Sequence, residues 1–165
     1  MNSERETRNA EAPLGRVLGI DYGEARVGVA RSDELGWFAH PLETIETARV
    51  EPVKRVCELV RQMGAGTVVL GMPYRMDGTA GPAVEKVREF RKRLEEALGE
   101  SVRIVETDER WSTVSAQRQL RTAGFDSRQS RPVIDQAAAA VILQAYLDRC
   151  QAEAGECMDD EDSGF

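Results

Sequence analysis

The chain has 165 residues, enough for a single domain with one core, and 31% of them are charged. It contains no apolar run as long as a membrane span, and its first thirteen residues lack the apolar segment of a secretory signal. Three scattered cysteines without a CxxC motif, beside His40 as the single histidine, argue against a zinc site or a disulfide framework. We therefore expect reduced thiols in a cytoplasmic protein with no membrane partner.

The net charge of −7 is unevenly distributed along the chain. Residues 151–165 hold six acidic residues and no Lys or Arg, whereas residues 110–131 hold five arginines and one acidic residue. An acidic end on a body with a basic patch remains compatible with a phosphate-rich partner. We predict a disordered segment over 1–15, one domain over 16–150 and an acidic, disordered tail over 151–165.

Three short β-prone runs open the predicted domain, at residues 16–20, 26–31 and 37–46. The gaps between them are short and carry glycine, which favours antiparallel hairpins. Pro41 lies within the third run and therefore places it at a sheet edge or a bulge.

The rest of the chain alternates between helical and β-prone patterns. The predicted elements are a helix over 51–63, a buried strand over 67–70, a Gly- and Pro-rich loop over 71–81, a charged amphipathic helix over 82–98, a strand over 102–106, a helix over 112–121, a polar loop over 124–130 and an Ala-rich helix over 132–149.

This order predicts an α/β fold with one mixed, five-stranded sheet and helices on both faces. The later strands alternate with helices, so they should lie parallel to the first strand and be joined by right-handed crossovers. Functional sites in such sheets form at the carboxyl ends of the strands.

Carboxylates are predicted at that edge of the sheet. Asp21 ends the first strand, Asp108 and Glu109 follow the fifth, and Asp135 begins the apolar face of the last helix. Each also has an ordinary structural explanation, because Asp is common in Asp-x-Gly turns and acids are common in the first turn of helices. Alanines in the last helix would let it approach the sheet and bring Asp135 beside Asp21.

Clustered carboxylates repel one another unless a cation joins them, and hard divalent ions choose oxygen ligands. We interpret Asp21, Glu109 and Asp135 as catalytic residues that bind Mg²⁺ or Mn²⁺, with Asp108 as a further candidate ligand. Two such ions could activate a water and stabilise the leaving oxygen of a phosphodiester. A single histidine weakens any histidine-based triad.

Residues that could contact a nucleic acid lie near the same edge. Tyr74 and Arg75 belong to the loop after the fourth strand and could stack on or pair with nucleotides. Arg110, Arg128 and Arg131 belong to the basic stretch and could bind phosphates. A structural loop and a solvated helix face are the alternative interpretations. The loop is not a Walker A motif, because it lacks the Gly-Lys-Ser/Thr ending.

Eight short motifs together resemble the YqgF/RuvX family over about residues 16–149. They are Gly19-Ile20-Asp21-Tyr22-Gly23, Arg26-Val27-Gly28-Val29-Ala30, Pro41-Leu42-Glu43-Thr44-Ile45, Gly71-Met72-Pro73, Asp77-Gly78-Thr79, Asp108-Glu109-Arg110, Ser112-Thr113 and Asp135-Gln136-Ala137-Ala138. Each motif is short, but their joint order is specific.

The resemblance implies an RNase H-like nuclease domain related to the RuvC resolvases. It implies catalytic carboxylates at Asp21, in the Asp108-Glu109 pair and at Asp135, and we favour Glu109 of the pair for its longer reach. Members are described as Holliday junction resolvases and as nucleases that mature the 5′ end of 16S ribosomal RNA.

Within the resemblance, Arg26 and Thr113 join the expected substrate-binding residues. Family members often carry lysine in the loop before the last Asp, where this chain has Arg128 and Arg131. Arginine keeps the charge but binds phosphate with a different geometry.

We favour a nuclease acting on structured RNA, with resolution of four-way DNA junctions as the alternative. A monomer is favoured over a dimer because residues 85–98 are too heavily charged for an apolar interface. Two other classes stay open. An ATP-binding module of the actin and sugar-kinase type also opens with Asp-x-Gly but needs two such domains, and a non-catalytic RNA-binding assembly factor could share the fold.

Overall fold

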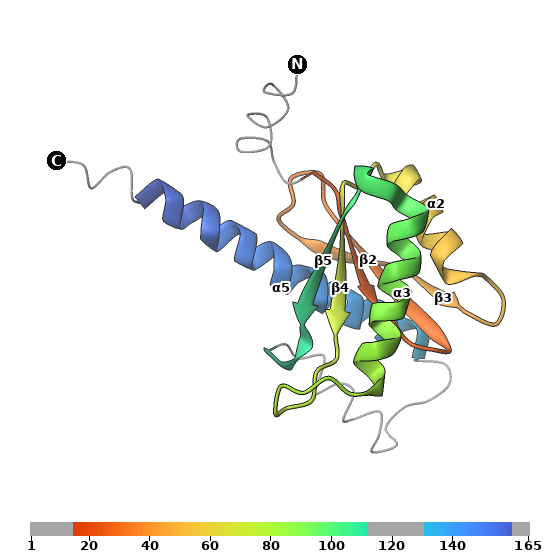
Figure 1. Cartoon of the computed structure of the whole chain (residues 1–165). Coiled ribbons are helices and arrows are strands. Elements are labelled where there is room, and N and C mark those ends of the chain that lie inside the picture. The colour runs from red at the N-terminus through yellow and green to blue at the C-terminus, as the bar shows by residue number, and fades with distance from the viewer. Residues whose placement is uncertain (1–14, 112–130, 160–165) are drawn as a thin grey trace.

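The computed structural model describes residues 15–111 and 131–159, and within these the side chains of 111, 131–133 and 155–159 are left aside (Figure 1). The strands are β1 (Val17–Asp21), β2 (Arg26–Ser32), β3 (Ala39–Glu46), β4 (Thr67–Met72) and β5 (Arg103–Asp108). The helices are α2 (Pro52–Met63), α3 (Pro82–Leu98) and α5 (Arg131–Asp159), with short 3-10 helices η1 (Gly99–Ser101) and η2 (Glu109–Trp111).

The five strands form one mixed sheet in the order β3-β2-β1-β4-β5. β1, β2 and β3 are successively antiparallel, whereas β4 and β5 run parallel to β1 and to each other. The predicted hairpins and the predicted parallel crossovers are therefore both confirmed. The predicted helix over 112–121, the loop over 124–130 and residues 1–14 of the N-terminal segment predicted over 1–15 lie outside the described residues.

Pro41 has the position that its missing N–H group requires. β3 is an edge strand, and its pairing with β2 shifts register at this point, where Val29 pairs with Glu43 but Ala30 pairs with Pro41. Leu42 is the extra residue of the resulting bulge. The prediction of an edge or a bulge is confirmed in both respects.

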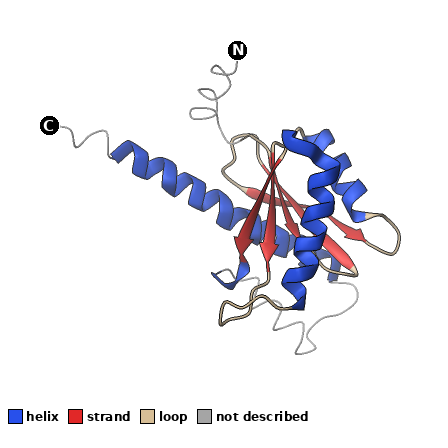
Figure 2. Cartoon of the chain, viewed as in Figure 1, coloured by secondary structure: helices blue, strands red, loops and turns tan. Residues whose placement is uncertain are grey.

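Helices cover both faces of the sheet, as predicted (Figure 2). α2 and α3 pack on one face around Leu18, Ile20 and Phe90. α5 packs on the other face around Val17, Val69 and a row of its own apolar residues, which are Ala138, Ala139, Ile142, Leu143, Tyr146 and Leu147. Because strand side chains alternate between faces, odd-numbered residues of β1 face α5.

The ends of α2 follow from its sequence. Its N-cap is Glu51, whose side chain accepts a hydrogen bond from the Lys54 N–H at 2.8 Å, and Pro52 occupies the first turn. Gly64 ends the helix with a φ of 63°.

α5 continues to Asp159 rather than ending at Arg149. The prediction of a disordered tail was therefore wrong for residues 151–159, which are helical. Alanine, glutamate and glutamine are good helix formers, so the acidic charge of this segment does not prevent a helix that is already nucleated by packing. Residues 160–165 lie outside the described part of the chain.

Gly19 sets how close α5 comes to β1. A Cβ atom at this position would lie 2.6 Å from Leu143 Cβ and 3.0 Å from the Ala139 carbonyl oxygen. The helix therefore rests directly on the strand backbone, a closer contact than the alanines of α5 alone would allow.

Gly19→Ala should lower the free energy of unfolding by about 1–3 kcal/mol, because α5 must shift to make room for the added methyl group. Gly66→Ala is the matched control, since nothing lies within 4 Å of a Cβ there. It should change stability by less than about 0.5 kcal/mol. Urea unfolding of both variants measures the difference, and equal stabilities would show that the α5 packing is looser than described.

Candidate active site

One row of residues crosses the sheet at the carboxyl end of β1. Asp21 pairs with Gly28 of β2, and the pairing of Ile20 with Leu70 places Gly71 of β4 on its other side. Gly71 in turn pairs with Thr107 of β5. Built Cβ atoms at both glycines would meet residues of α5, so this row faces α5. Strand alternation places Asp21 on the same face, because Gly19 also faces α5.

Asp135 lies over Gly28. A Cβ at position 28 would be only 2.0 Å from the Asp135 backbone oxygen, so a glycine is required for this approach. Arg26, two residues earlier on β2, donates from Nε to Asp135 Oδ2 at 2.8 Å. The Asp135 side chain is 7% exposed and that of Arg26 is 26% exposed, so the ion pair is largely shielded from water.

Glu109 lies over Gly71 on the other side of Asp21. A Cβ at position 71 would be 2.3 Å from Glu109 Oε1 and 2.6 Å from Ile142 Cδ1. Glu109 is 2% exposed and Asp21 is 4% exposed. Neighbouring strands are about 4.8 Å apart, so the positions of Gly28, Asp21 and Gly71 span roughly 10 Å. The structure thus brings the three predicted catalytic carboxylates to one edge of the sheet.

Asp108 has different surroundings. It pairs with Met72, whose side chain belongs to the core on the α2 and α3 face. The Arg110 guanidinium donates to both of its oxygens, from Nε to Oδ1 at 3.2 Å and from Nη2 to Oδ2 at 2.6 Å. These bonds hold the pKa of the Asp108 carboxyl below its ordinary value, although partial burial opposes the shift. Asp108 is therefore hydrogen-bonded to Arg110 on the α2 and α3 face of the sheet, opposite to the face of Asp21.

The carboxylates form an open arrangement. Among the described residues, no three His, Cys, Asp or Glu side chains are gathered closely enough to enclose one ion. Mg²⁺ typically binds one or two carboxylates and keeps water or substrate phosphate as its other ligands, so a closed protein cage is not needed. The all-oxygen donor set of Asp21, Glu109 and Asp135 fits a hard divalent ion of this kind.

The loop between β4 and α3 contacts Arg110. The Arg110 guanidinium lies over the Tyr74 ring, 5.9 Å from its centroid, and its Nη1 would be 3.1 Å from a Cβ at Gly78. Asp77 accepts from the Thr79 N–H at 2.9 Å, which closes the turn. Tyr74 also packs against the core, so Arg110 and Tyr74 form one structural unit beside Asp108.

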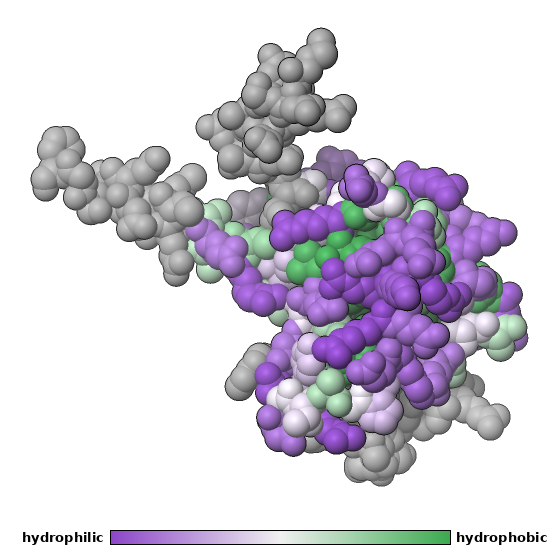
Figure 3. All heavy atoms as spheres, in the orientation of Figure 1, coloured by the Kyte–Doolittle hydropathy of each residue, from purple (hydrophilic) through white to green (hydrophobic). Residues whose placement is uncertain are grey.

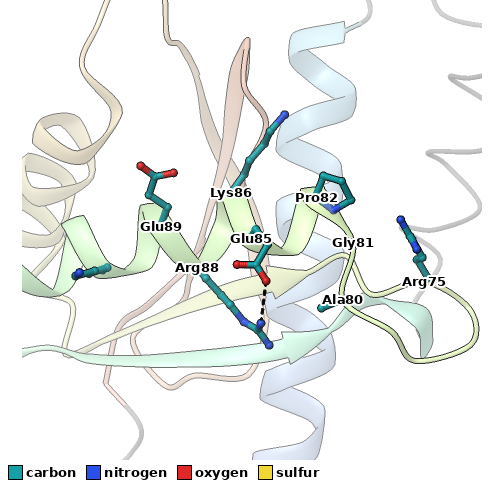
Figure 4. A pocket seen from close by; sticks show the side chains of 9 residues that line it. Arg75, Ala80, Gly81, Pro82, Glu85, Lys86, Arg88 and Glu89 are labelled. Atoms are coloured by element: carbon teal, nitrogen blue, oxygen red, sulfur yellow. Dashed lines mark hydrogen bonds and ion pairs between the residues drawn. The ribbon is translucent and has the colours of Figure 1, made fainter.

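Arg75 lies at one end of an open groove along the start of α3 (Figure 4). Its guanidinium is close to Gly81, where a built Cβ would be 2.9 Å from Nε. The groove is also lined by charges of both signs, Glu85, Lys86, Arg88, Glu89 and Lys92.

The structure does not describe the side chains of three predicted substrate-binding residues. Thr113 and Arg128 lie outside the described residues, and Arg131 is described only as the first residue of α5. One basic residue near the row was missed from the sequence. Arg149 of α5 donates from Nη2 to the hydroxyl of buried Thr107, and its position late in an apparently regular helix gave no signal.

Comparison with known proteins assigns the chain to a family. The family model described as "RuvX: Holliday junction resolvase" matches residues 15–149. The chain belongs to the RuvX family. The resemblance inferred from the eight motifs is therefore confirmed, and the ATP-binding module of the kinase type is set aside.

Several relatives of this RuvX chain carry the name "Putative pre-16S rRNA nuclease". The one from Acetivibrio thermocellus is 47% identical over 81% of this chain and 95% of its own length. Those from Fusobacterium nucleatum and a Geobacillus strain are 42% and 44% identical, and each alignment covers 82% of this chain and at least 98% of the relative.

Solved structures show that the fold of this RuvX chain is that of RuvC, and hence RNase H-like as predicted. "T. thermophilus RuvC in complex with Holliday junction substrate" matches with a TM-score of 0.53 at 18% identity, over 83% of this chain and 96% of that one. The structure titled "Thermus thermophilus RuvC structure" matches with a TM-score of 0.51 at 16% identity. In the described part of the chain, no helix combines the length and apolar character that crossing a membrane requires.

The coupling energy between Arg26 and Asp135 can be measured with a double-mutant cycle. In metal-free buffer, Arg26→Gln and Asp135→Asn should each destabilise the protein by about 1–3 kcal/mol, because each leaves a shielded charge without its partner. The double variant should lose about 1–2 kcal/mol less than the sum of the single variants.

The exposed pair of Arg49 and Glu46, with side chains 81% and 47% exposed, is the matched control for this cycle. Its coupling energy should stay below about 0.5 kcal/mol. Equal coupling in the two cycles, measured by urea unfolding, would mean that burial does not strengthen the pair in the candidate site.

Proposed function

We propose that this RuvX-family chain is a metal-dependent endonuclease that hydrolyses phosphodiester bonds in the 5′-end maturation of precursor 16S ribosomal RNA. The observation that carries the proposal is the row in which Asp135 lies over Gly28 and Glu109 over Gly71, on either side of Asp21. Both the name of the relatives and the description of the family model are those of nucleases, which supports hydrolysis of a phosphodiester bond as the activity.

In this proposal Asp21, Glu109 and Asp135 hold Mg²⁺ or Mn²⁺. When bound, these ions would polarise the phosphoryl oxygens and lower the pKa of a water. The chain's own residues fix the positions of the ligands. The backbone contact at Gly28 sets the height of Asp135 above the sheet, and Arg26 orients the Asp135 carboxylate. The close approach at Gly71 sets the height of Glu109 above the sheet.

Recognition of the substrate would depend on cations around this edge. Arg26, which pairs with Asp135, and Arg75, which lines the groove along α3, are candidate contacts, and Thr113, Arg128 and Arg131 remain predicted contacts. Arg110 and Tyr74 would act as a unit, since they already contact one another. Burial of the carboxylates where α5 meets the sheet would keep bulk water from screening the charges that act on the scissile phosphate.

The proposal gives Glu109 and its neighbour Asp108 different roles, since only Glu109 is proposed to bind metal. Asp21→Asn, Glu109→Gln and Asp135→Asn should each lower cleavage by at least about 100-fold, because each removes a charged ligand. Asp108→Asn is the matched control and should keep activity within about 10-fold, since that carboxylate pairs with Arg110. Excess EDTA should abolish cleavage by the unaltered protein.

Cleavage in excess EDTA would refute the metal requirement. If Asp108→Asn inactivates while Glu109→Gln does not, the two acidic residues have exchanged roles. Calorimetric titration with Mn²⁺ distinguishes catalytic loss from loss of metal binding, and it would also reveal a non-catalytic RNA-binding factor as a protein that binds no metal at all.

The second candidate function is resolution of four-way DNA junctions, which the description of the family model favours. Junction resolution requires two coordinated cuts and therefore two active sites in one assembly, most simply a two-fold dimer. The outer face of α3 is a poor surface for such a dimer, because its residues are hydrophilic (Figure 3) and pair among themselves, as in Arg88 with Glu85 and Arg91 with Glu95. A monomer with one site suffices for trimming RNA.

The two substrates should be compared side by side, with a precursor 16S RNA transcript and a synthetic four-way junction in the same Mg²⁺ buffer. We expect cleavage of the RNA and sedimentation of the protein as a monomer in the presence and absence of the junction. Symmetric paired nicks in the junction by a stable dimer, with the RNA left intact, would reverse the assignment.

A further inference from the structure

The connection between β2 and β3 exposes an unusual number of large apolar side chains. We call residues 33–38 the aromatic hairpin. Within it Leu35 is 63% exposed, Trp37 52% and Phe38 63%. These are three of the five large hydrophobic residues that are exposed in the described part of the chain, and they lie within four consecutive positions. Clustered exposure of this kind is typical of an interaction surface.

The aromatic hairpin is held in shape by its own hydrogen bonds. Asp33 Oδ1 accepts from the Trp37 N–H at 2.8 Å, and the Asp33 N–H donates to the Phe38 carbonyl at 3.0 Å. Gly36 supplies a φ of 73° at the turn, which L residues with side chains rarely adopt. None of these bonds depends on an apolar side chain at positions 35, 37 or 38, so the turn itself does not require them.

α5 fixes the aromatic hairpin from one side. Gln144 accepts from the Ala39 N–H at 2.8 Å and donates to the Trp37 carbonyl at 3.0 Å. Gln151 donates to the same carbonyl at 3.3 Å. The exposed rings are thus presented on a preorganised support, which lowers the entropy cost of binding a partner.

The surface lies at the opposite end of the sheet from the candidate active site. Ser32, which precedes the hairpin, accepts from the Val17 N–H at the start of β1, whereas Asp21 ends that strand. Four residue steps along β1 separate the two edges by about 13 Å. In Figure 1 the β2–β3 connection lies at the top, while β4 and β5 point downward to the candidate active site. A partner bound to the hairpin would leave the carboxylates open to substrate.

Charge indicates the kind of partner. Asp33 and Glu34 belong to the hairpin, with 80% of the Glu34 side chain exposed, and Asp148 lies beside Gln144 on α5. Arg16 is a nearby cation and is paired with Glu34 at 2.7 Å. Glu153, two residues after Gln151 on α5, is a further exposed acidic residue. This excess of negative charge repels phosphate and attracts cations.

We propose that the aromatic hairpin and the adjoining face of α5 form a docking surface for a protein segment that is both basic and apolar. Apolar side chains of that segment would pack on Leu35, Trp37 and Phe38, and its Lys or Arg residues would face Glu34 and Asp148. The inference does not depend on the proposed nuclease chemistry, because the surface shares no residue with the candidate active site.

The probe is a short amphipathic peptide of leucine and lysine, with a peptide of leucine and glutamate of equal length for comparison. In the full chain with Trp111→Phe, Trp37 is the remaining tryptophan and its fluorescence reports on the surface. We expect the basic peptide to shift Trp37 emission to shorter wavelength and to bind less tightly as salt rises. The acidic peptide should bind at least 10-fold more weakly.

Two sets of variants test the surface itself. Leu35→Ser with Phe38→Ser, and separately Glu34→Lys with Asp148→Lys, should each weaken basic-peptide binding at least 10-fold. Val50→Ser, which alters another exposed apolar residue outside the surface, should leave binding unchanged. Thermal unfolding checks that each variant is folded, which the exposure of these side chains leads us to expect. Cleavage of short RNA should be unaffected by all of them.

Three outcomes would overturn the proposal. Equal binding of the basic peptide by the unaltered protein and by both surface variants would show that attraction is non-specific. A shift in Trp37 emission with single-stranded RNA but not with peptide would indicate that the rings of Trp37 and Phe38 stack on bases. Concentration-dependent dimerisation that Leu35→Ser with Phe38→Ser abolishes would identify a second copy of the chain as the occupant.

Discussion

The candidate site depends on the direct contact between α5 and the backbone of the sheet. Gly19, Gly28 and Gly71 each allow an atom of α5 or Glu109 to occupy space that a Cβ would fill. A helix on a sheet with ordinary side chains would stand several ångströms higher, and Asp135 would then lose its place beside Asp21. The same contact buries Asp135, so the pairing with Arg26 and the proximity to Asp21 both follow from it.

Strand alternation decides which acidic residue joins Asp21. Thr107 faces α5, so Asp108 turns to the other face, where Arg110 holds it. Glu109 follows after the strand has ended, and the η2 turn returns its side chain to the α5 face over Gly71. Sequence reasoning favoured Glu109 for its length, whereas the structure offers a different reason, namely the direction in which each side chain leaves the chain.

Most of the fold could be predicted because its helices and strands show regular spacing of apolar residues and are bounded by Pro and Gly. Pro82 and Gly99 bound α3, and Pro41 marks an edge, whatever the tertiary context. The extent of α5 could not be predicted from charge, since packing of its first turns stabilises the residues beyond. In the candidate site, the acidic residues could be proposed from their type alone, but the contact of Arg149 with Thr107 depends on where a long helix crosses the sheet. The exposure of Trp37 likewise could not be predicted from the sequence, because an aromatic residue in a β-prone run is expected to be buried.

The bulge at Leu42 also bears on how copies of the chain meet in solution. A free edge strand with a regular hydrogen-bond ladder can accept a strand from another molecule, which leads to aggregation. β3 carries Pro41, which has no N–H to donate, immediately before the irregular pairing at Leu42. A foreign strand would find the ladder interrupted near its middle. This edge of the sheet is thereby less suited to pairing with a strand of another copy of the chain.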